Sequence, residues 1–167
     1  MVPLEVDDVA PFEDWPAAVR GALAFLHTSV GLDVWMLTRV IGDMQVVLHA
    51  DPEGMVPVGT AIPWDRSFCR KMVNGTGPRV STVTAATPAY ANMLTGHAER
   101  VAAYMGVPLV TRAHTVFGTL CGVSARAQPL SFARNLPSVE LVARLLSTLL
   151  PSDDTPFPPL DELLADG

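Results

Sequence analysis

The chain has 167 residues, of which 49% are hydrophobic and 17% charged; this composition is typical of one core-rich globular domain and excludes an intrinsically disordered chain. The formal net charge is −6 and the eleven Lys and Arg residues are scattered, which argues against a nucleic-acid partner because phosphate binding needs a basic face. No apolar run approaches the ~18 residues of a membrane span, and the acidic N-terminus does not resemble a signal peptide. We therefore expect a cytoplasmic protein that does not contact a membrane.

The first third of the chain predicts a helix followed by a β-hairpin. Asp14 is a suitable N-cap, Pro16 suits the first helical turn, and apolar residues recur at helical spacing over residues 15–30. Two β-like runs follow, over residues 34–41 and 44–50, and the Gly-Asp pair between them is typical of a tight turn. We therefore expect these two strands to pair with each other.

The middle of the chain predicts shorter elements. Asp65 is a candidate cap for a helix that ends near Val73, at an Asn-Gly breaker. Residues 79–83 predict a strand, whereas residues 84–96 are rich in small and turn-forming residues and predict an irregular segment. A short helix is expected over residues 98–104, because a glycine follows soon after it.

The last third predicts a second hairpin and a C-terminal helix. Residues 107–111 and 115–124 predict strands, and the second is long and apolar as a central strand should be. A helix then begins at Ser131 or Asn135, and its apolar face is wider than packing on one sheet requires. We therefore expect the first and last helices to form a homodimer, which Leu146→Glu should separate.

The order of these elements predicts an α+β fold with an antiparallel sheet, since strands and helices do not alternate regularly. We divide the chain into an N-terminal arm over residues 1–13, one domain over residues 14–150, and a tail over residues 151–167 that is rich in proline and acidic residues.

Three regions of this domain resemble the GAF family of small-ligand sensor domains. They are residues 59–70 (GTAIPWDRSFCR), residues 87–90 (TPAY), and the pair 105–110 (MGVPLV) and 116–123 (VFGTLCGV). The resemblance implies a GAF-like (profilin/PAS-like) fold with a central antiparallel sheet of about six strands. It also implies that the terminal helices cover one face, and that residues 59–104 cover the other face and enclose a ligand pocket.

Strand alternation selects the face of the pocket. In the last predicted strand, one face carries Phe117, Thr119, Cys121 and Val123, and the other carries Gly118, Leu120 and Gly122. Glycines let a helix approach closely, so we assign their face to the terminal helices and the other face to the pocket.

The residues expected around the pocket indicate what kind of ligand it would bind. Stacking on the rings of Trp64, Tyr90 and Tyr104 favours a planar ligand of modest size, and a nearby arginine would favour an anionic one. The predicted ligand-binding residues are Trp64, Cys69, Tyr90, Tyr104, Thr119 and Cys121.

The two cysteines, Cys69 and Cys121, are interpreted as small buried hydrophobic residues, with a redox pair or an attachment site as the less favoured alternatives. The resemblance gives Cys69 a rival role, because free methionine-R-sulfoxide reductases share the fold and have a cysteine at a similar position. The cover has no second cysteine, and Glu99 does not match the catalytic glutamate of those enzymes. A thiol with no partner thiol in reach cannot turn over by disulfide exchange. We therefore assign no catalytic residue and expect no enzyme. A bilin site is not expected either, since no histidine follows either cysteine.

The four histidines do not have the spacing of metal ligands. We therefore expect no metal site, and the sequence identifies no cofactor.

We expect a bacterial regulatory sensor domain. Binding of a small molecule would order residues 84–96, shift the terminal helices and so reach an output signalling protein or domain. The alternative is a degenerate GAF domain that acts only as a dimerisation or interaction module, and in that case side chains would fill the pocket.

Overall fold

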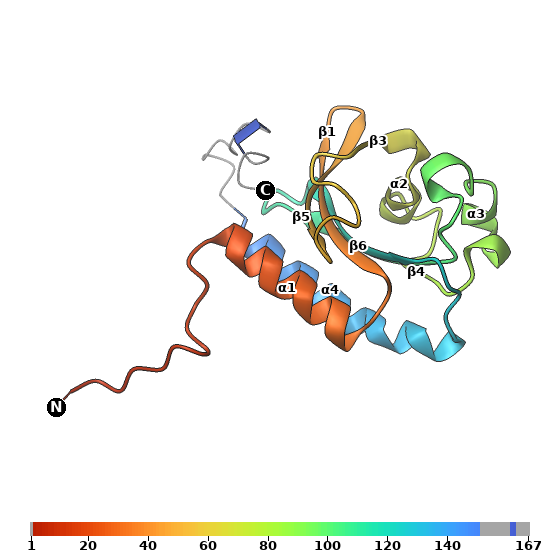
Figure 1. Cartoon of the computed structure of the whole chain (residues 1–167). Helices are drawn as coiled ribbons and strands as arrows, with labels where there is room; N and C mark the ends of the chain where they lie inside the picture. Colours follow the sequence, from red (N-terminus) through yellow and green to blue (C-terminus); the bar gives the residue numbers. More distant parts are fainter. Residues whose placement is uncertain (1, 151–160, 163–167) are drawn as a thin grey trace.

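The computed structural model describes residues 2–150 and 161–162, apart from the side chain of His97. Within these residues a six-stranded antiparallel sheet has the order β3-β2-β1-β6-β5-β4, and helices lie on both of its faces (Figure 1). Strand β6 pairs with both β1 and β5, so it lies in the middle of the sheet. The strands are β1 (Val34–Ile41), β2 (Met44–Asp51), β3 (Ala61–Pro63), β4 (Val80–Ser81), β5 (Ala103–Val110) and β6 (Val116–Ser124), and the two long helices are α1 (Trp15–Ser29) and α4 (Leu136–Thr148).

Helices α1 and α4 lie next to each other on one face of the sheet (Figure 1). The Asp14 carboxylate accepts a hydrogen bond of 2.8 Å from the Ala17 amide, so α1 begins at the predicted cap. Leu26 of α1 and Val139 of α4 are fully buried in the core between the helices and the sheet. Each such side chain stabilises the fold by about 1.5–3 kcal/mol.

The other face is covered by short helices and turns. Ser67 caps the longest of them: its hydroxyl accepts a hydrogen bond of 3.1 Å from the Arg70 amide. The prediction that Asp65 caps this helix is wrong, because the chain first makes a 3₁₀ turn at Trp64 and α-helical geometry begins later. These covering elements are η1 (Trp64–Arg66), α2 (Phe68–Val73), η2 (Thr84–Ala86), α3 (Pro88–Ala91) and η3 (Gly96–Ala98).

The structure confirms the α+β class and the antiparallel GAF-like sheet, but two elements differ from their predictions. The helix predicted over residues 98–104 is wrong, since β5 begins at Ala103. Tyr104 and Met105 are buried in the cores on opposite faces of the sheet, and a segment buried on both faces is most stable as a central strand. The prediction also missed β3, a three-residue strand that is too short to show a periodic pattern.

Strand β6 sends alternate side chains to the two faces, with Phe117 as the exception to the prediction. A shift in register between β5 and β6 leaves Phe117 as an extra residue, and its ring joins the helix-side core, 6.0 Å from the Trp15 ring. The prediction that the glycines of this strand allow close helix packing is also wrong at Gly118. A Cβ there would collide with the backbone carbonyl of Thr38 in β1, so strand pairing rather than helix packing requires this glycine.

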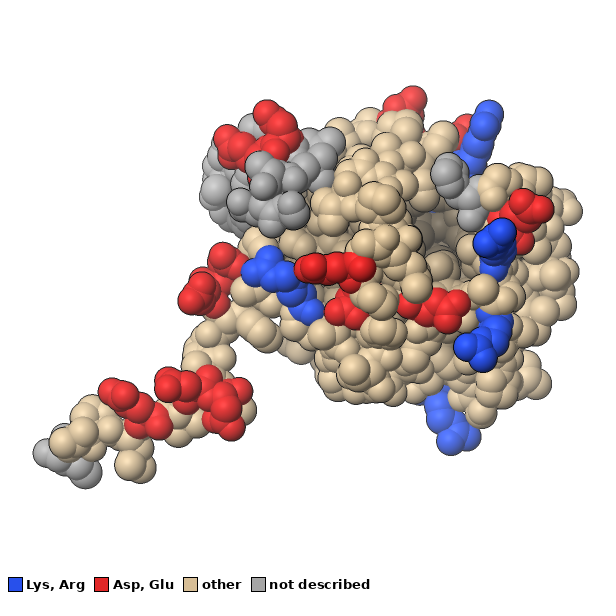
Figure 2. All heavy atoms as spheres, in the orientation of Figure 1, with Lys and Arg blue, Asp and Glu red and all other residues tan. Residues whose placement is uncertain are grey.

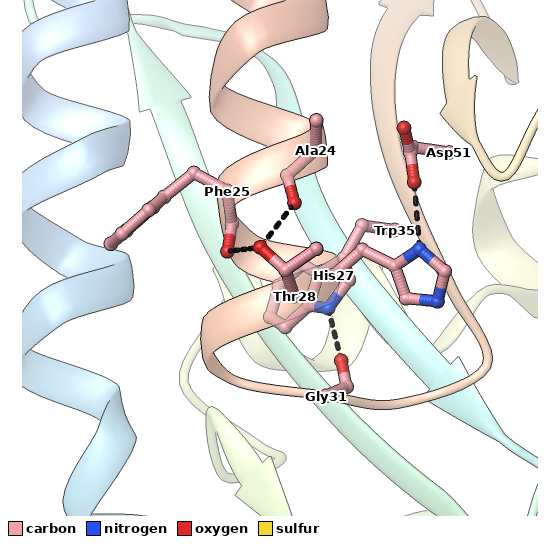
Figure 3. A network of polar contacts seen from close by, with 7 residues as sticks. All are labelled: Ala24, Phe25, His27, Thr28, Gly31, Trp35 and Asp51. Carbon is pink, nitrogen blue, oxygen red and sulfur yellow. Dashed lines mark hydrogen bonds and ion pairs between the residues drawn. The ribbon is translucent and has the colours of Figure 1, made fainter.

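A polar network connects the end of α1 to the sheet (Figure 3). The imidazole Nδ1 of His27 lies 2.8 Å from a carboxylate oxygen of Asp51, at the end of β2. The indole N–H of Trp35 donates to the carbonyl of Gly31 at 2.5 Å, and the Thr28 hydroxyl donates to carbonyls one turn earlier in α1. The contact of His27 joins α1 to β2, and the bond from Trp35 joins β1 to the turn after α1, whereas the Thr28 bonds lie within α1.

Residues 2–13 are exposed and extend away from the sheet (Figure 1). Figure 2 shows acidic side chains along this arm, where the sequence has Glu5, Asp7, Asp8 and Glu13. The tail assigned to residues 151–167 lies outside the described residues except at 161–162. Among the helices that the structure describes, none has the length and apolar character needed to cross a membrane.

Candidate functional site

The six residues predicted to bind a ligand all lie on the sheet face opposite α1 and α4. Five of them are at most 4% exposed, and Trp64 is partly buried and packs against the others. The structure therefore brings the six together, and their role in binding a ligand stays a prediction. The cover contributes Trp64 from η1, Cys69 from α2 and Tyr90 from α3, and the sheet contributes Tyr104 from β5 and Thr119 and Cys121 from β6.

Three aromatic rings, of Phe68, Tyr90 and Tyr104, fill the space between the cover and the sheet; we call them the aromatic cluster. Their centroids lie 4.9–5.5 Å apart, a range in which each pair contributes about 0.5–1.5 kcal/mol beyond the area that it buries. The Tyr90 hydroxyl donates to the carbonyl of Pro78 at 2.6 Å. The Tyr104 hydroxyl donates instead to the Sγ atom of Cys69 at 3.2 Å. The cluster therefore holds the cover onto the sheet.

Below the aromatic cluster, a chain of buried hydrogen bonds leads from Gln45 to the sulfur of Cys69. The Gln45 amide donates to the hydroxyls of Thr38 and Thr119, at 3.0 Å each, and these two hydroxyls lie 2.7 Å apart. Thr119 donates its single proton to the Cys69 Sγ at 3.3 Å, so it accepts from Thr38. Every donor in this series of hydrogen bonds therefore points towards the Cys69 sulfur. We call the three side chains of Gln45, Thr38 and Thr119 the donor chain.

The surroundings of Cys69 favour its ionised form. Its sulfur accepts hydrogen bonds from the hydroxyls of Thr119 and Tyr104, and Cys121 belongs to the same buried cluster. Hydrogen bonding from Cys121 foremost, and then from Thr119, Tyr104 and Gln45, lowers the pKa of Cys69 to about 6, although burial alone would raise it. Cys69 is therefore mostly ionised at neutral pH, and the thiolate is the nucleophilic form of cysteine.

The neighbours of Cys69 keep their protons. The hydrogen bond to Cys69, together with burial, raises the pKa of Cys121 well above its usual range. Burial raises the pKa of Tyr104 and of Tyr90, and the negative charge on Cys69 raises both further. These pKa shifts favour a single anion at the site, on Cys69, among donors that keep their protons.

The prediction that no thiol lies within reach of Cys69 is wrong. That prediction considered only the cover, whereas Cys121 comes from the central strand β6 and belongs to the same buried cluster as Cys69. The two cysteines are small and buried, as we expected, and they belong to the same buried cluster, which the less favoured alternative of a redox pair requires. Glu99, the acidic residue within residues 82–104 of the cover, is exposed.

Sequence reasoning missed four residues of the site: Thr38, Gln45, Phe68 and Met72. Thr38 and Gln45 are polar residues inside otherwise apolar strands and are 2% and 3% exposed. Such an interruption is a usable signal, because a buried polar group needs a partner. Phe68 and Met72 lie on the buried face of α2 and complete the packing around Cys69.

A surface cavity of about 570 Å³ lies away from this site, between β5 and α4, where Arg79, Arg112 and Arg144 contribute to its walls. A smaller cavity is lined by residues near Val83 and Arg100, at the rim of the cover. Among the residues that the structure describes, no three His, Cys, Asp or Glu side chains gather as a metal ion would need.

No family model and no curated protein matches this sequence. Solved structures do match. The free methionine-R-sulfoxide reductase from Neisseria meningitidis, in complex with its substrate, is 19% identical over 95% of this chain and 84% of its own, with a TM-score of 0.65. The second GAF domain of DevS from Mycobacterium smegmatis is 18% identical over 81% of this chain and 94% of its own, with a TM-score of 0.57.

The chromophore-binding domain of an unusual bacteriophytochrome from R. palustris is also similar, at 14% identity and a TM-score of 0.63. That match covers 81% of this chain, which spans only 55% of the bacteriophytochrome domain. At these identities the likeness is one of fold. The chain therefore has the fold of a GAF domain, as its sequence motifs predicted.

Proposed function

We propose that this chain is a regulatory sensor domain that recognises a small molecule between the cover and the sheet. The donor chain is the observation that supports this function. Its three side chains are at most 3% exposed and converge on one point beside Cys69, where apolar side chains would make a more stable core. A fully bonded polar group in a core also gives directional hydrogen bonds, which are what a specific ligand needs.

The cover is built to open at low cost. Its helices α2 and α3 have six and four residues, and helices this short are marginal without tertiary contacts. Lys71 donates to the carbonyl of Ala89 at 2.8 Å and joins the two helices, while Tyr90 anchors α3 through its bond to Pro78. A planar ligand that replaced the Tyr90 ring would stack on Phe68 and accept hydrogen bonds from the donor chain.

We further propose that α1 and α4 form a homodimer interface through which the domain signals to an output protein or domain. Phe25 of α1 is 50% exposed, and Figure 3 shows its ring extending from α1 on the side of α4. Three leucines are 55–57% exposed here: Leu141 and Leu145 of α4, and Leu149 directly after it. Exposed apolar side chains on neighbouring helices are typical of a protein contact.

The variant Leu146→Glu, which we expected to separate the dimer, does not test this interface. Leu146 is 4% exposed and belongs to the core between α4 and the sheet, so a glutamate there would unfold the domain. Leu145→Glu is the appropriate variant. Sedimentation velocity should show a dimer for the wild type and a monomer for Leu145→Glu, while Leu130→Glu, which changes an exposed leucine outside α4, should leave the dimer intact. A monomeric wild type at micromolar concentration would refute the interface.

Native mass spectrometry of freshly purified protein tests the ligand site. We expect a bound small molecule in the wild type and in Asp51→Asn, which alters the polar network at α1 on the other side of the sheet. Gln45→Leu removes the donors at the start of the donor chain without a large change in volume, so it should lose the bound mass. Equal retention by all three proteins would place the ligand elsewhere.

A second candidate function is favoured by the packing of the aromatic cluster. If no preparation of the wild type carries a bound mass while the dimer is present, the domain is a dimerisation or interaction module whose interior is filled by Tyr90 and its neighbours. Regulation without catalysis remains our proposal in either case.

A further inference from the structure

The two thiols of the chain meet across the boundary between the cover and the sheet. Cys69 lies on the buried face of α2 and Cys121 lies on β6, and both belong to the same buried cluster. Thr119, two residues before Cys121 on β6, donates its hydroxyl proton to the Cys69 sulfur at 3.3 Å. The sequence contains no third cysteine. Both side chains are at most 4% exposed, so each thiol has the other as its nearest reaction partner within the chain.

The surroundings give the two sulfurs different roles. The hydroxyls of Thr119 and Tyr104 donate to the Cys69 sulfur at 3.3 and 3.2 Å and stabilise its negative charge. The neighbouring Cys69 and burial raise the pKa of Cys121, so Cys121 is the neutral thiol of the pair. A thiolate beside a protonated thiol is the arrangement of an attacking and a resolving cysteine.

We propose that Cys69 and Cys121 form a reversible disulfide when the domain meets hydrogen peroxide, so that the cover is a thiol-based redox sensor. This property goes beyond the recognition of a small molecule, since it needs only the two sulfurs and the oxidant. Peroxide is about as small as water, so it can reach the buried sulfur through brief opening of the short covering helices.

The reaction has two balanced steps. The Cys69 thiolate attacks one peroxide oxygen, the O–O bond breaks, Cys69 becomes a sulfenic acid (S–OH) and hydroxide leaves. Cys121 then attacks the Cys69 sulfur, the S–O bond breaks, the disulfide forms, and the departing oxygen takes up protons as water. The two thiols together lose two electrons, which reduce one peroxide to two waters. A dithiol reductant returns both thiols.

The disulfide would change how the cover contacts the sheet. An S–S bond is about 2.05 Å long, so α2 and β6 must approach each other more closely than a hydrogen bond between thiols requires. Thr119 and Tyr104 would lose the anionic acceptor of their hydroxyl protons. Oxidation would therefore fix α2 to the centre of the sheet and rearrange the donor chain.

The full chain, reduced and then treated with hydrogen peroxide, tests this inference. Free thiols titrated with a chromogenic disulfide reagent in denaturant should fall from two per chain to none, and the intact mass should fall by about 2 Da. A dithiol should restore both thiols. Non-reducing electrophoresis should show a monomer, because the bond lies within one chain.

Single variants separate the two roles. Cys121→Ser should stop at the sulfenic acid on Cys69, which dimedone traps, whereas Cys69→Ser should leave Cys121 unmodified. Tyr104→Phe should slow the loss of thiols at neutral pH about two- to tenfold, because a smaller fraction of Cys69 is ionised. Tyr90→Phe, which keeps every donor to Cys69, should react as the wild type. Circular dichroism confirms that each variant is folded.

The inference is overturned if both thiols of the folded wild type survive peroxide that oxidises free cysteine, or if the disulfide joins two chains. Neither result bears on the bound mass that is expected in the wild type and lost in Gln45→Leu, so the failure of the redox site and the failure of the ligand site can be told apart.

Discussion

Removing one oxygen atom, in Tyr104→Phe, should raise the pKa of Cys69. The Tyr104 hydroxyl donates to the Cys69 Sγ at 3.2 Å and is fully buried. Gly106 makes room for it, since a Cβ at that position would collide with the hydroxyl. The phenyl ring of the variant would keep its place against Phe68 and Tyr90, so the change removes a donor and leaves the packing.

The size of the change follows from the charge on the acceptor. A hydrogen bond to a charged group contributes about 1.5–3 kcal/mol, and one pH unit corresponds to about 1.4 kcal/mol. Loss of the Tyr104 bond should therefore raise the pKa of Cys69 by about one to two. Starting from about 6, the thiolate would then form close to neutral pH.

The ultraviolet absorbance of the thiolate, followed against pH with Cys69→Ser as the blank, measures this pKa. Tyr90→Phe is the matched control, because the Tyr90 hydroxyl bonds to Pro78 and not to sulfur. It should lower stability by about 1 kcal/mol and leave the thiolate midpoint unchanged. If Tyr104→Phe titrates at the wild-type midpoint, or if both variants shift equally, the Tyr104 hydroxyl does not stabilise the thiolate.

Two further predictions concern stability. Gly118→Ala should destabilise the domain by about 3 kcal/mol or more, because its Cβ would collide with the Thr38 carbonyl and separate β6 from β1. A Gly118→Ala variant that melts at the same temperature as the wild type would contradict this. The lowered pKa of Cys69 means that the unfolded chain binds more protons than the native one between pH 6 and about 8.5. The stability from this group is therefore fully present above about pH 8.5 and is lost as the pH falls through 6. Urea unfolding should show this slope in the wild type and not in Cys69→Ser.

Hydrophobic patterns and caps predicted the long elements well. Asp14 begins α1, and the hairpin of β1 and β2 has nearly the predicted bounds. They did not predict the start of β5, because the small and apolar residues before Gly106 suit a helix as well as a strand. Pairing with β6 decides between the two, and that contact is made by residues distant in the sequence.

The candidate site was predictable only in part, for a similar reason. Alternation along β6 placed Thr119 and Cys121 on the cover side, but the sequence does not show which residues of β1 and β2 lie opposite them. Thr38 lies directly across from Thr119 only because of the β1–β6 register. The contact between Cys69 and Cys121 likewise depends on where α2 crosses the sheet, which no local pattern encodes.

The central strand also gives a route by which a change at the site could reach the helices, and this leads to a last prediction. Thr119 and Cys121 face the cover, while Leu120 between them is fully buried in the core with α1 and α4. A disulfide at Cys121 that shifts β6 must therefore also shift the packing of Leu120. Hydrogen exchange should show changed protection in α4 as well as in α2 and β6 when the reduced and oxidised proteins are compared, and peroxide should have no such effect on Cys121→Ala. Changes confined to α2 and β6 would show that the thiol pair is not coupled to the helices.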